Sequence, residues 1–156
     1  MNRVFARIAR LGGQPLRRAE SPPSSGAYAL IIRNKQTLAL EVGRLGRFAL
    51  PAGVFIYVGR AGRGLPARLD RHRRKSKTVF WHIDRLTTWA GVFVEEIMVV
   101  PQKPQWECKL LRVCLECSGV GAPIPRFGAG DCRAGCPAHL LHYSPDKLNL
   151  REPRAR

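Results

Sequence analysis

The sequence predicts an α+β domain in which antiparallel strands alternate with helices. Two patterns indicate this class: segments rich in β-branched and aromatic residues whose apolar positions alternate, and segments between them with apolar residues at helical spacing. The chain has 156 residues and is 45% apolar, which suffices for one packed core and excludes a wholly disordered chain. We expect one domain at residues 25–145, between a basic flexible leader at 1–24 and a basic tail at 146–156.

The expected leader is rich in arginine and poor in acidic residues. Its arginines are Arg3, Arg7, Arg10, Arg17 and Arg18. The Pro/Ser cluster at residues 21–25 cannot continue a helix and is typical of a linker. We expect a solvated basic arm, and an organelle transit segment is the alternative.

Three strands are expected in the first half of the domain. Residues 27–33 have strand composition and alternating apolar side chains, and a polar turn separates them from a second strand at 37–42. Glycine and proline punctuate a loop at 43–53. The β-branched and aromatic residues 54–58 then form the third strand.

Two helices and one more strand complete the predicted domain. The first helix starts near Leu65 or Pro66, because proline is favoured in a first helical turn. Residues 92–100 form a strand that Pro101 ends, and residues 105–117 form the second helix.

The charge of the chain indicates a polyanionic partner. There are 27 Lys and Arg residues against 11 Asp and Glu, a formal net charge of +16. Nucleic acid is the first candidate partner for such an excess. No apolar run approaches the roughly 20 residues that span a bilayer, and the basic residues do not lie on one long amphipathic helix, so no membrane partner is expected. We expect a cytoplasmic protein associated with the nucleoid.

Basic residues are concentrated at 60–77, where only Asp70 opposes them. Like charges at helical spacing, such as Arg71 and Arg74, repel one another unless an anion compensates. Nucleic-acid phosphates would compensate this repulsion, and binding would then depend on salt concentration. The alternative is that these residues form an ordinary solvated helix face. The side chains expected to contact nucleic acid are Arg60, Arg63, Arg71, Arg73, Arg74, Lys75 and Lys77.

Three polar side chains occupy apolar helical faces. Arg68 and His72 share the stripe of the first helix with two leucines, and a buried guanidinium needs either a core carboxylate or a substrate phosphate. Glu107 lies similarly on the second helix, where a carboxylate needs a cation or an arginine. With Tyr28 and Tyr57 on neighbouring strands, the set would suit phosphodiester cleavage: the carboxylate for a hydrated Mg²⁺, the arginine for charge, and a phenol or imidazole for proton transfer. Each tyrosine taken alone is more typical of a core or rim position at which its hydroxyl is hydrogen-bonded.

At these residues the chain resembles the GIY-YIG nuclease superfamily. The motifs occur in order: Gly26-Ala27-Tyr28, Tyr57-Val58-Gly59, Arg68 and His72 on the following helix, and Glu107 on a later helix. Further stretches at 80–84, 107–108, 127–132 and 139–140 are similar to the Uri-type subgroup, whose members occur alone or fused to endonuclease III in some archaea. The resemblance covers residues 25–144.

The resemblance implies a small antiparallel sheet flanked by helices and an endonuclease that hydrolyses DNA with Mg²⁺, or with Mn²⁺ in its place. We also expect a role in DNA repair and a DNA repair partner protein. Tyr28 would activate the attacking water, and Tyr57 would position water or phosphate. Arg68 would bind the scissile phosphate, while His72 would assist proton transfer or hold a water at the metal. Glu107 would be the only direct protein ligand of the metal.

Two features depart from the family pattern. The connector between the tyrosines is longer than in most members, although lengthening a loop costs little. The late active-site asparagine of many members has no counterpart among the asparagines of this chain, so its role is empty or filled by Asp131 or another group. His82 either lines the catalytic cleft, as the subgroup motif implies, or is a core histidine bonded to Asp84.

All five cysteines lie in the C-terminal third of the chain. The odd number in a chain of this size disfavours a disulfide framework and indicates a reducing cytosol. Cys132, Cys136 and His139 have a loose zinc-binding spacing, and a closed tetrahedral site needs a fourth ligand. Candidates for that ligand are Cys108, Cys117 and His142. Buried cysteines in a helical cap are the expected arrangement, and a structural zinc is not expected.

The sequence therefore predicts a Mg²⁺-dependent endonuclease that acts on DNA. The alternative is a non-catalytic DNA-binding module, accessory to repair or recombination, that binds DNA without metal-stimulated nicking. An RNA-binding protein is disfavoured, because the sequence offers no exposed aromatic platform of the kind that single-strand readers use.

Overall fold

A six-stranded antiparallel sheet lies at the centre of the fold, with strand order β1-β6-β2-β5-β8-β7. The structure is a computed structural model that describes residues 1–145, so the predicted tail at 146–156 lies outside the described residues. The strands are β1 (Gln14–Pro15), β2 (Gly26–Asn34), β5 (Gly53–Ala61), β6 (Val92–Pro101), β7 (Val120–Gly121) and β8 (Leu140–Tyr143). The predicted α+β class is confirmed.

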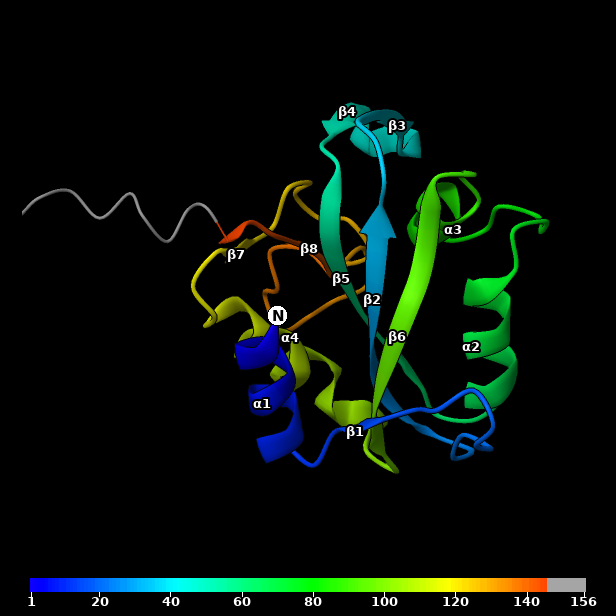
Figure 1. The fold of residues 1–156 in the computed structure, drawn as a ribbon, viewed down its shortest axis with the longest axis vertical. Coiled ribbons are helices and arrows are strands. Elements are labelled where there is room, and N and C mark those ends of the chain that lie inside the picture. The colour runs from blue at the N-terminus through cyan, green and yellow to red at the C-terminus, as the bar shows by residue number, and fades with distance from the viewer. Residues whose placement is uncertain (146–156) are drawn as a thin grey trace, which may run out of the picture.

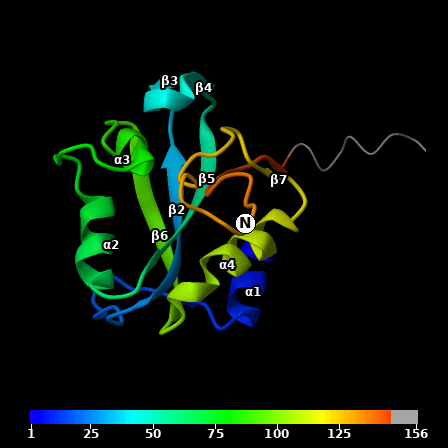
Figure 2. The same ribbon diagram turned by 180° about the vertical axis from the view of Figure 1, so that it is seen from behind.

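Within the described residues, four α-helices flank the sheet in two pairs (Figures 1 and 2). Helices α1 (Asn2–Arg10) and α4 (Glu107–Leu115) cover one face, while α2 (Leu65–Arg73) and α3 (His82–Thr87) cover the other. Strands β3 (Leu38–Glu41) and β4 (Arg47–Leu50) form a separate hairpin at one end of the sheet (Figure 1). Two 3₁₀ turns, η1 (Gly43–Leu45) and η2 (Pro104–Trp106), complete the elements.

The alternation of side chains along β2 creates a core on each face of the sheet. Tyr28 and Leu30 belong to the apolar cluster that contains residues of α2 and α3. Ala27 and Ala29 belong to the cluster that contains residues of α1 and α4. Because consecutive strand residues point to opposite faces, a strand covered on both sides must be apolar at nearly every position, and all of β2 except Arg33 is buried.

The residues predicted to form a flexible leader are instead packed onto the domain. Helix α1 buries Val4 and Ile8, which lie one turn apart, in the same cluster as the apolar residues of α4. Its Arg7 forms an ion pair with Glu116, at the C-terminal end of α4. Strand β1 then pairs with β6 at the sheet edge. The prediction failed because arginines surround the few apolar residues of this helix. A narrow apolar stripe is nevertheless enough to hold a helix in place when a second helix packs against it.

The strands predicted at 27–33, 54–58 and 92–100 are confirmed as β2, β5 and β6, and the strand at 37–42 as the shorter β3. The two predicted helices are confirmed as α2 and α4, although α4 begins only after the turn η2. The predicted loop at 43–53 contains β4, which pairs with β3. Helix α3 and strands β7 and β8 were not predicted, because segments this short carry little periodic signal.

Asp84 is a buried carboxylate that joins α2 to α3. Its Oδ2 accepts hydrogen bonds from the backbone N–H groups of Phe80 and Trp81, at 3.0 and 2.9 Å, and from Nη2 of Arg71 at 2.7 Å. Nζ of Lys77 lies 3.7 Å from Oδ1. Burial raises the pKa of the Asp84 carboxyl, but the backbone N–H groups and Arg71 outweigh it and hold this pKa below its usual value. The carboxylate therefore stays charged among its donors.

Replacing Asp84 with asparagine is expected to lower the free energy of unfolding by about 3 kcal/mol, because two cations would lose their buried counter-charge. The side chains of Arg71 and Lys77 are only 22% and 2% exposed. The matched control is Asp70→Asn, whose carboxylate is 70% exposed and pairs with Arg74, and it should change the free energy by less than about 0.5 kcal/mol. Urea unfolding measures both, and equal losses would contradict the role of Asp84.

Candidate active site

A cavity of about 300 Å³ lies where α2, β5, the start of α4 and the loop at 128–131 meet. Side chains from distant parts of the chain line it. All the side chains predicted to act in catalysis and metal binding are among them: Tyr28, Tyr57, Arg68, His72, His82 and Glu107. The structure therefore brings the whole predicted set together in one place.

Strands β2 and β5 present both phenols to the same face of the sheet. Tyr28 lies directly opposite Gly59, and Tyr57 is two residues before Gly59, so the two tyrosines share a face. A Cβ atom on Gly59 would lie 2.5 Å from Oη of Tyr28. Glycine is therefore required at the end of the Tyr57-Val58-Gly59 motif, because the phenol of the neighbouring strand occupies the space of a side chain.

The hydroxyl of Tyr28 and the imidazole of His72 are in direct contact, with Oη 2.8 Å from Nε2. Burial, and next the charge of Lys77, lowers the pKa of His72 to about 3, so this imidazole is neutral at pH 7. Burial also raises the pKa of Tyr28 and of Tyr57, against the opposing effect of Arg68. A protonated phenol that touches a neutral imidazole can pass a proton along the hydrogen bond.

Arg68 is held in place by neutral partners. Its Nη1 donates to the carbonyl oxygen of Arg60 at 2.8 Å, and its guanidinium lies 4.6 Å from the ring centre of Trp81. Of the ion pairs formed within residues 1–145, none includes Arg68. The alternative that Arg68 pairs with a carboxylate in the core is therefore wrong for the described residues. A carbonyl and an aromatic ring fix the side chain while its charge remains open to an anion in the cavity.

Glu107 begins α4 and has two basic neighbours. Its Oε2 lies 3.4 Å from Nε of Arg60, and its Oε1 lies 3.4 Å from Nδ1 of His139. We expected this carboxylate to bind a cation or to pair with an arginine. In the structure it pairs with Arg60, whose side chain is 57% exposed. Mg²⁺ prefers one or two carboxylates and keeps several waters, so Glu107 on the wall of this cavity is a donor that fits it. Asp131, one of the alternatives for the role of the missing asparagine, lines the same cavity.

His82 lines the cavity and is not bonded to Asp84. Its Nδ1 accepts a hydrogen bond from the backbone N–H of Gly128 at 3.0 Å, which leaves the proton of the neutral ring on Nε2. Burial, and then Arg85, lowers the pKa of His82. Gly128 has a φ of +68°, and a Cβ there would lie 3.1 Å from the Tyr57 ring, so the loop backbone approaches the cavity closely.

The basic residues predicted to contact nucleic acid divide into two groups. Arg71, Lys75 and Lys77 donate to groups within the domain. Arg71 donates to Asp84 and Lys77 to the hydroxyl of Thr87, while Lys75 donates to the backbone carbonyls of Thr87, Trp89 and Val92. Helix α2 ends at Arg73, so the expected repulsion along one helix does not extend to the residues after it. The counter-anion of Arg71 is Asp84 rather than a phosphate. The exposed members of the predicted set are Arg60, Arg63, Arg73, Arg74 and Lys75, and of these Lys75 is the one whose charge is held by backbone carbonyls.

Two aromatic side chains of the cavity were missed by the sequence analysis. Trp81 lies under the guanidinium of Arg68, and Phe80 is 78% exposed at the same cavity. An exposed aromatic residue is therefore present after all. The only signal in the sequence was the similarity of the stretch at 80–84 to a subgroup motif.

The fold and the site together define a small α+β domain with a basic, aromatic-lined polar cavity. Residues 27–154 match the family described as domain of unknown function DUF123, and the chain belongs to this family. No curated protein and no solved structure matches the chain. No helix among residues 1–145 has the length and apolar character needed to cross a membrane.

Proposed function

We propose that the protein is a divalent-metal-dependent endonuclease of the GIY-YIG type that hydrolyses phosphodiester bonds of DNA. The proposal rests above all on one observation, the convergence of Tyr28, Tyr57, Arg68, His72 and Glu107 on a single cavity. These residues come from two strands and two helices, and their order matches the motifs of that superfamily. The net charge of +16 supports a polyanionic substrate.

In the proposed reaction, Tyr28 activates the attacking water. Its hydroxyl takes a proton from the water while its own proton moves to Nε2 of His72, 2.8 Å away. The neutral imidazole offers a lone pair at Nε2, but its lowered pKa makes it a weak base, so it holds the proton only transiently. The high pKa of the phenol likewise makes a concerted transfer preferable to a free phenolate. Tyr57, on the same sheet face, orients the water or the phosphate.

Arg68 binds the scissile phosphate in this proposal, because its charge is positioned by neutral partners at the cavity wall. Glu107 holds the divalent cation, and the exposed side chain of Arg60 can move off the carboxylate as the cation binds. When bound, Mg²⁺ or Mn²⁺ supplies positive charge for the transition state and for the leaving oxygen.

The test is nicking of supercoiled plasmid, followed by a panel of linear, nicked, flapped and branched DNA, with Mg²⁺ and with Mn²⁺. We expect cleavage that EDTA abolishes. Arg68→Ala, purified in the same way, should cleave about 100-fold more slowly. That loss would show that the cleavage is not due to a contaminating nuclease. Salt-sensitive binding without metal-stimulated nicking of any substrate would reject the nuclease and favour the accessory DNA-binding module.

Removing two exposed charges at the end of α2 is expected to weaken DNA binding. Arg73→Ala combined with Arg74→Ala should lower the slope of log affinity against log salt by about 1 to 2, since each phosphate contact releases counterions. The control is Arg3→Ala with Arg10→Ala, which removes the same charge from α1 on the opposite face of the sheet (Figure 1). Fluorescence anisotropy at several salt concentrations measures both, and identical slopes would show that α2 does not contact DNA.

A further inference from the structure

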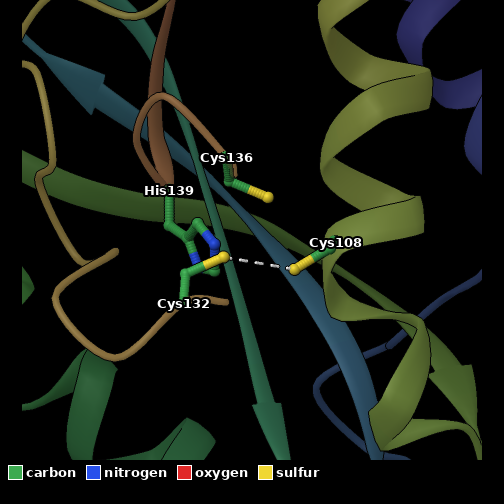
Figure 3. Close-up of side chains that lie close together, drawn as sticks. All are labelled: Cys108, Cys132, Cys136 and His139. Carbon is green, nitrogen blue, oxygen red and sulfur yellow. Dashed lines mark hydrogen bonds between the residues drawn. The ribbon is translucent and has the colours of Figure 1, made fainter. Parts of the chain in front are cut away.

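Three cysteines and a histidine gather beside the cavity, between the start of α4 and the segment that precedes β8. They are Cys108, Cys132, Cys136 and His139, and Figure 3 shows their side chains converging. We propose that these four residues bind a structural zinc ion. Such a site goes beyond the proposed nuclease activity and does not depend on it.

The spacing of the ligand atoms suits tetrahedral coordination. One ligand atom from each side chain can be chosen so that all lie within 4.8 Å of one another, and the Sγ atoms of Cys108 and Cys132 are 3.6 Å apart. In a tetrahedral zinc site with sulfur and nitrogen ligands, neighbouring ligand atoms lie about 3.5–3.8 Å apart. The four side chains thus need only small movements to close around zinc, and Cys₃His is a common structural ligand set.

His139 offers a nitrogen that has no other use in the described part of the chain. Its side chain is 3% exposed, and its Nε2 is buried without a hydrogen-bond partner. Leaving a buried polar atom unpaired is unfavourable, because the atom loses its hydrogen bonds to water, so an unexplained one indicates a missing ligand. Figure 3 shows the ring of His139 among the cysteine sulfur atoms. Coordination of zinc by Nε2 would satisfy this atom.

The other nitrogen of the same ring faces Glu107. Nδ1 of His139 lies 3.4 Å from Oε1 of Glu107, which is the arrangement of a carboxylate that orients a zinc-bound histidine. Glu107 also precedes the ligand Cys108 directly in α4. A zinc ion here would therefore fix the carboxylate that lines the cavity, through the peptide chain and through the histidine.

The fold gives such a crosslink a structural purpose. Residues 122–139, between β7 and β8, contain no helix or strand, and segments longer than about 12–15 residues without such structure are uncommon in compact domains. This segment carries Gly128, Gly130 and Asp131, which line the cavity. Three of the proposed ligands lie in the second half of this segment and the fourth lies on α4, so one metal ion would link the cavity loop to a helix.

The structure also selects among the candidates for the fourth ligand. Cys117 donates from Sγ to the carbonyl of Val113 within its own helix region, and the ring of His142 packs against Phe55. Cys108 is the candidate that reaches the other three. A disulfide between Cys108 and Cys132 is the competing use of the same sulfur atoms, and the experiment distinguishes the two.

The test is the metal content of the untagged full chain, purified without added zinc or chelator and measured by mass spectrometry of the elements. We expect about one zinc per chain, released in step with titration of the thiols by a mercurial reagent. Replacement of the zinc by Co²⁺ should give the visible absorption of a tetrahedral thiolate site. These measurements use the native chain, so they decide the question even if a variant fails to fold.

Variants assign the ligands. Cys108→Ser and Cys132→Ser should each lower the bound zinc by about tenfold or more, while the control Cys117→Ser should keep it. Folded wild-type protein that contains less than about 0.1 zinc per chain and takes up no Co²⁺ would overturn the proposal. A Cys108–Cys132 disulfide found by peptide mapping without reductant would overturn it as well. None of these measurements involves DNA, so the result is independent of the nuclease assay.

Discussion

Replacing Glu107 with glutamine is expected to lower the DNA cleavage rate by about 1,000-fold, the loss that corresponds to several kcal/mol of metal-ion stabilisation. A neutral amide is a poor ligand for Mg²⁺, whereas its size leaves the start of α4 intact. The amide oxygen can still accept from Nδ1 of His139, which lies 3.4 Å from the present carboxylate. The variant therefore removes the charge and little else.

Single-turnover cleavage at saturating enzyme is the measurement for this variant, with DNA affinity measured separately. Glu116→Gln is the matched control, because this carboxylate lies just beyond the other end of α4, is 60% exposed and pairs with Arg7. It should cleave like the wild type. The zinc content of Glu107→Gln should also stay at the wild-type level. Cleavage by Glu107→Gln within about tenfold of wild type would contradict its assignment as the metal ligand.

Replacing Tyr28 with phenylalanine is expected to slow cleavage by about 100- to 10,000-fold, the usual contribution of a positioned proton acceptor. The change removes the hydroxyl that lies 2.8 Å from Nε2 of His72 and leaves the buried ring in the core of the sheet. DNA affinity should change by no more than about threefold, because the phenol does not supply charge for phosphate binding. The loss should therefore appear in the rate of the bound complex.

Tyr143→Phe is the control for this second variant. Tyr143 lies at the end of β8, in the apolar cluster on the α1 and α4 face, and is not among the residues that line the cavity. Its loss of a hydroxyl should leave the cleavage rate unchanged. If Tyr28→Phe cleaves as fast as Tyr143→Phe, another group activates the water and the Tyr28–His72 pair is structural.

Local patterns were sufficient for the long elements of this fold. Strands β2, β5 and β6 are each nine or ten residues of mostly apolar or β-branched composition, so their signal is strong. Helix α3, with six residues, and helix α1, with nine, were not predicted. Helix α1 presents only Val4 and Ile8 as buried residues between arginines, and its stability depends on α4, which lies about a hundred residues away in the chain.

The candidate site was partly predictable for a related reason. The residue types and their order could be identified from the motifs, because Tyr28, Tyr57, Arg68, His72 and Glu107 are chemically distinctive at those positions. The side chains that contact these residues could not be identified from the motifs. That Arg60 would contact Glu107, or that Trp81 would lie under Arg68, follows from the packing of separate elements around the cavity.

By itself, the sequence determined the α+β class, the two apolar helix faces and a basic charge too large for a neutral ligand. Only the tertiary structure decided which charges have a carboxylate partner: Arg71 and Lys77 share the single carboxylate of Asp84, whereas Arg68 has no carboxylate partner among residues 1–145. It also decided that Cys108 joins the late cysteines and His139. The physical reason is that counter-charges and metal ligands act through space over a few ångströms, and the chain brings such partners together only when it folds.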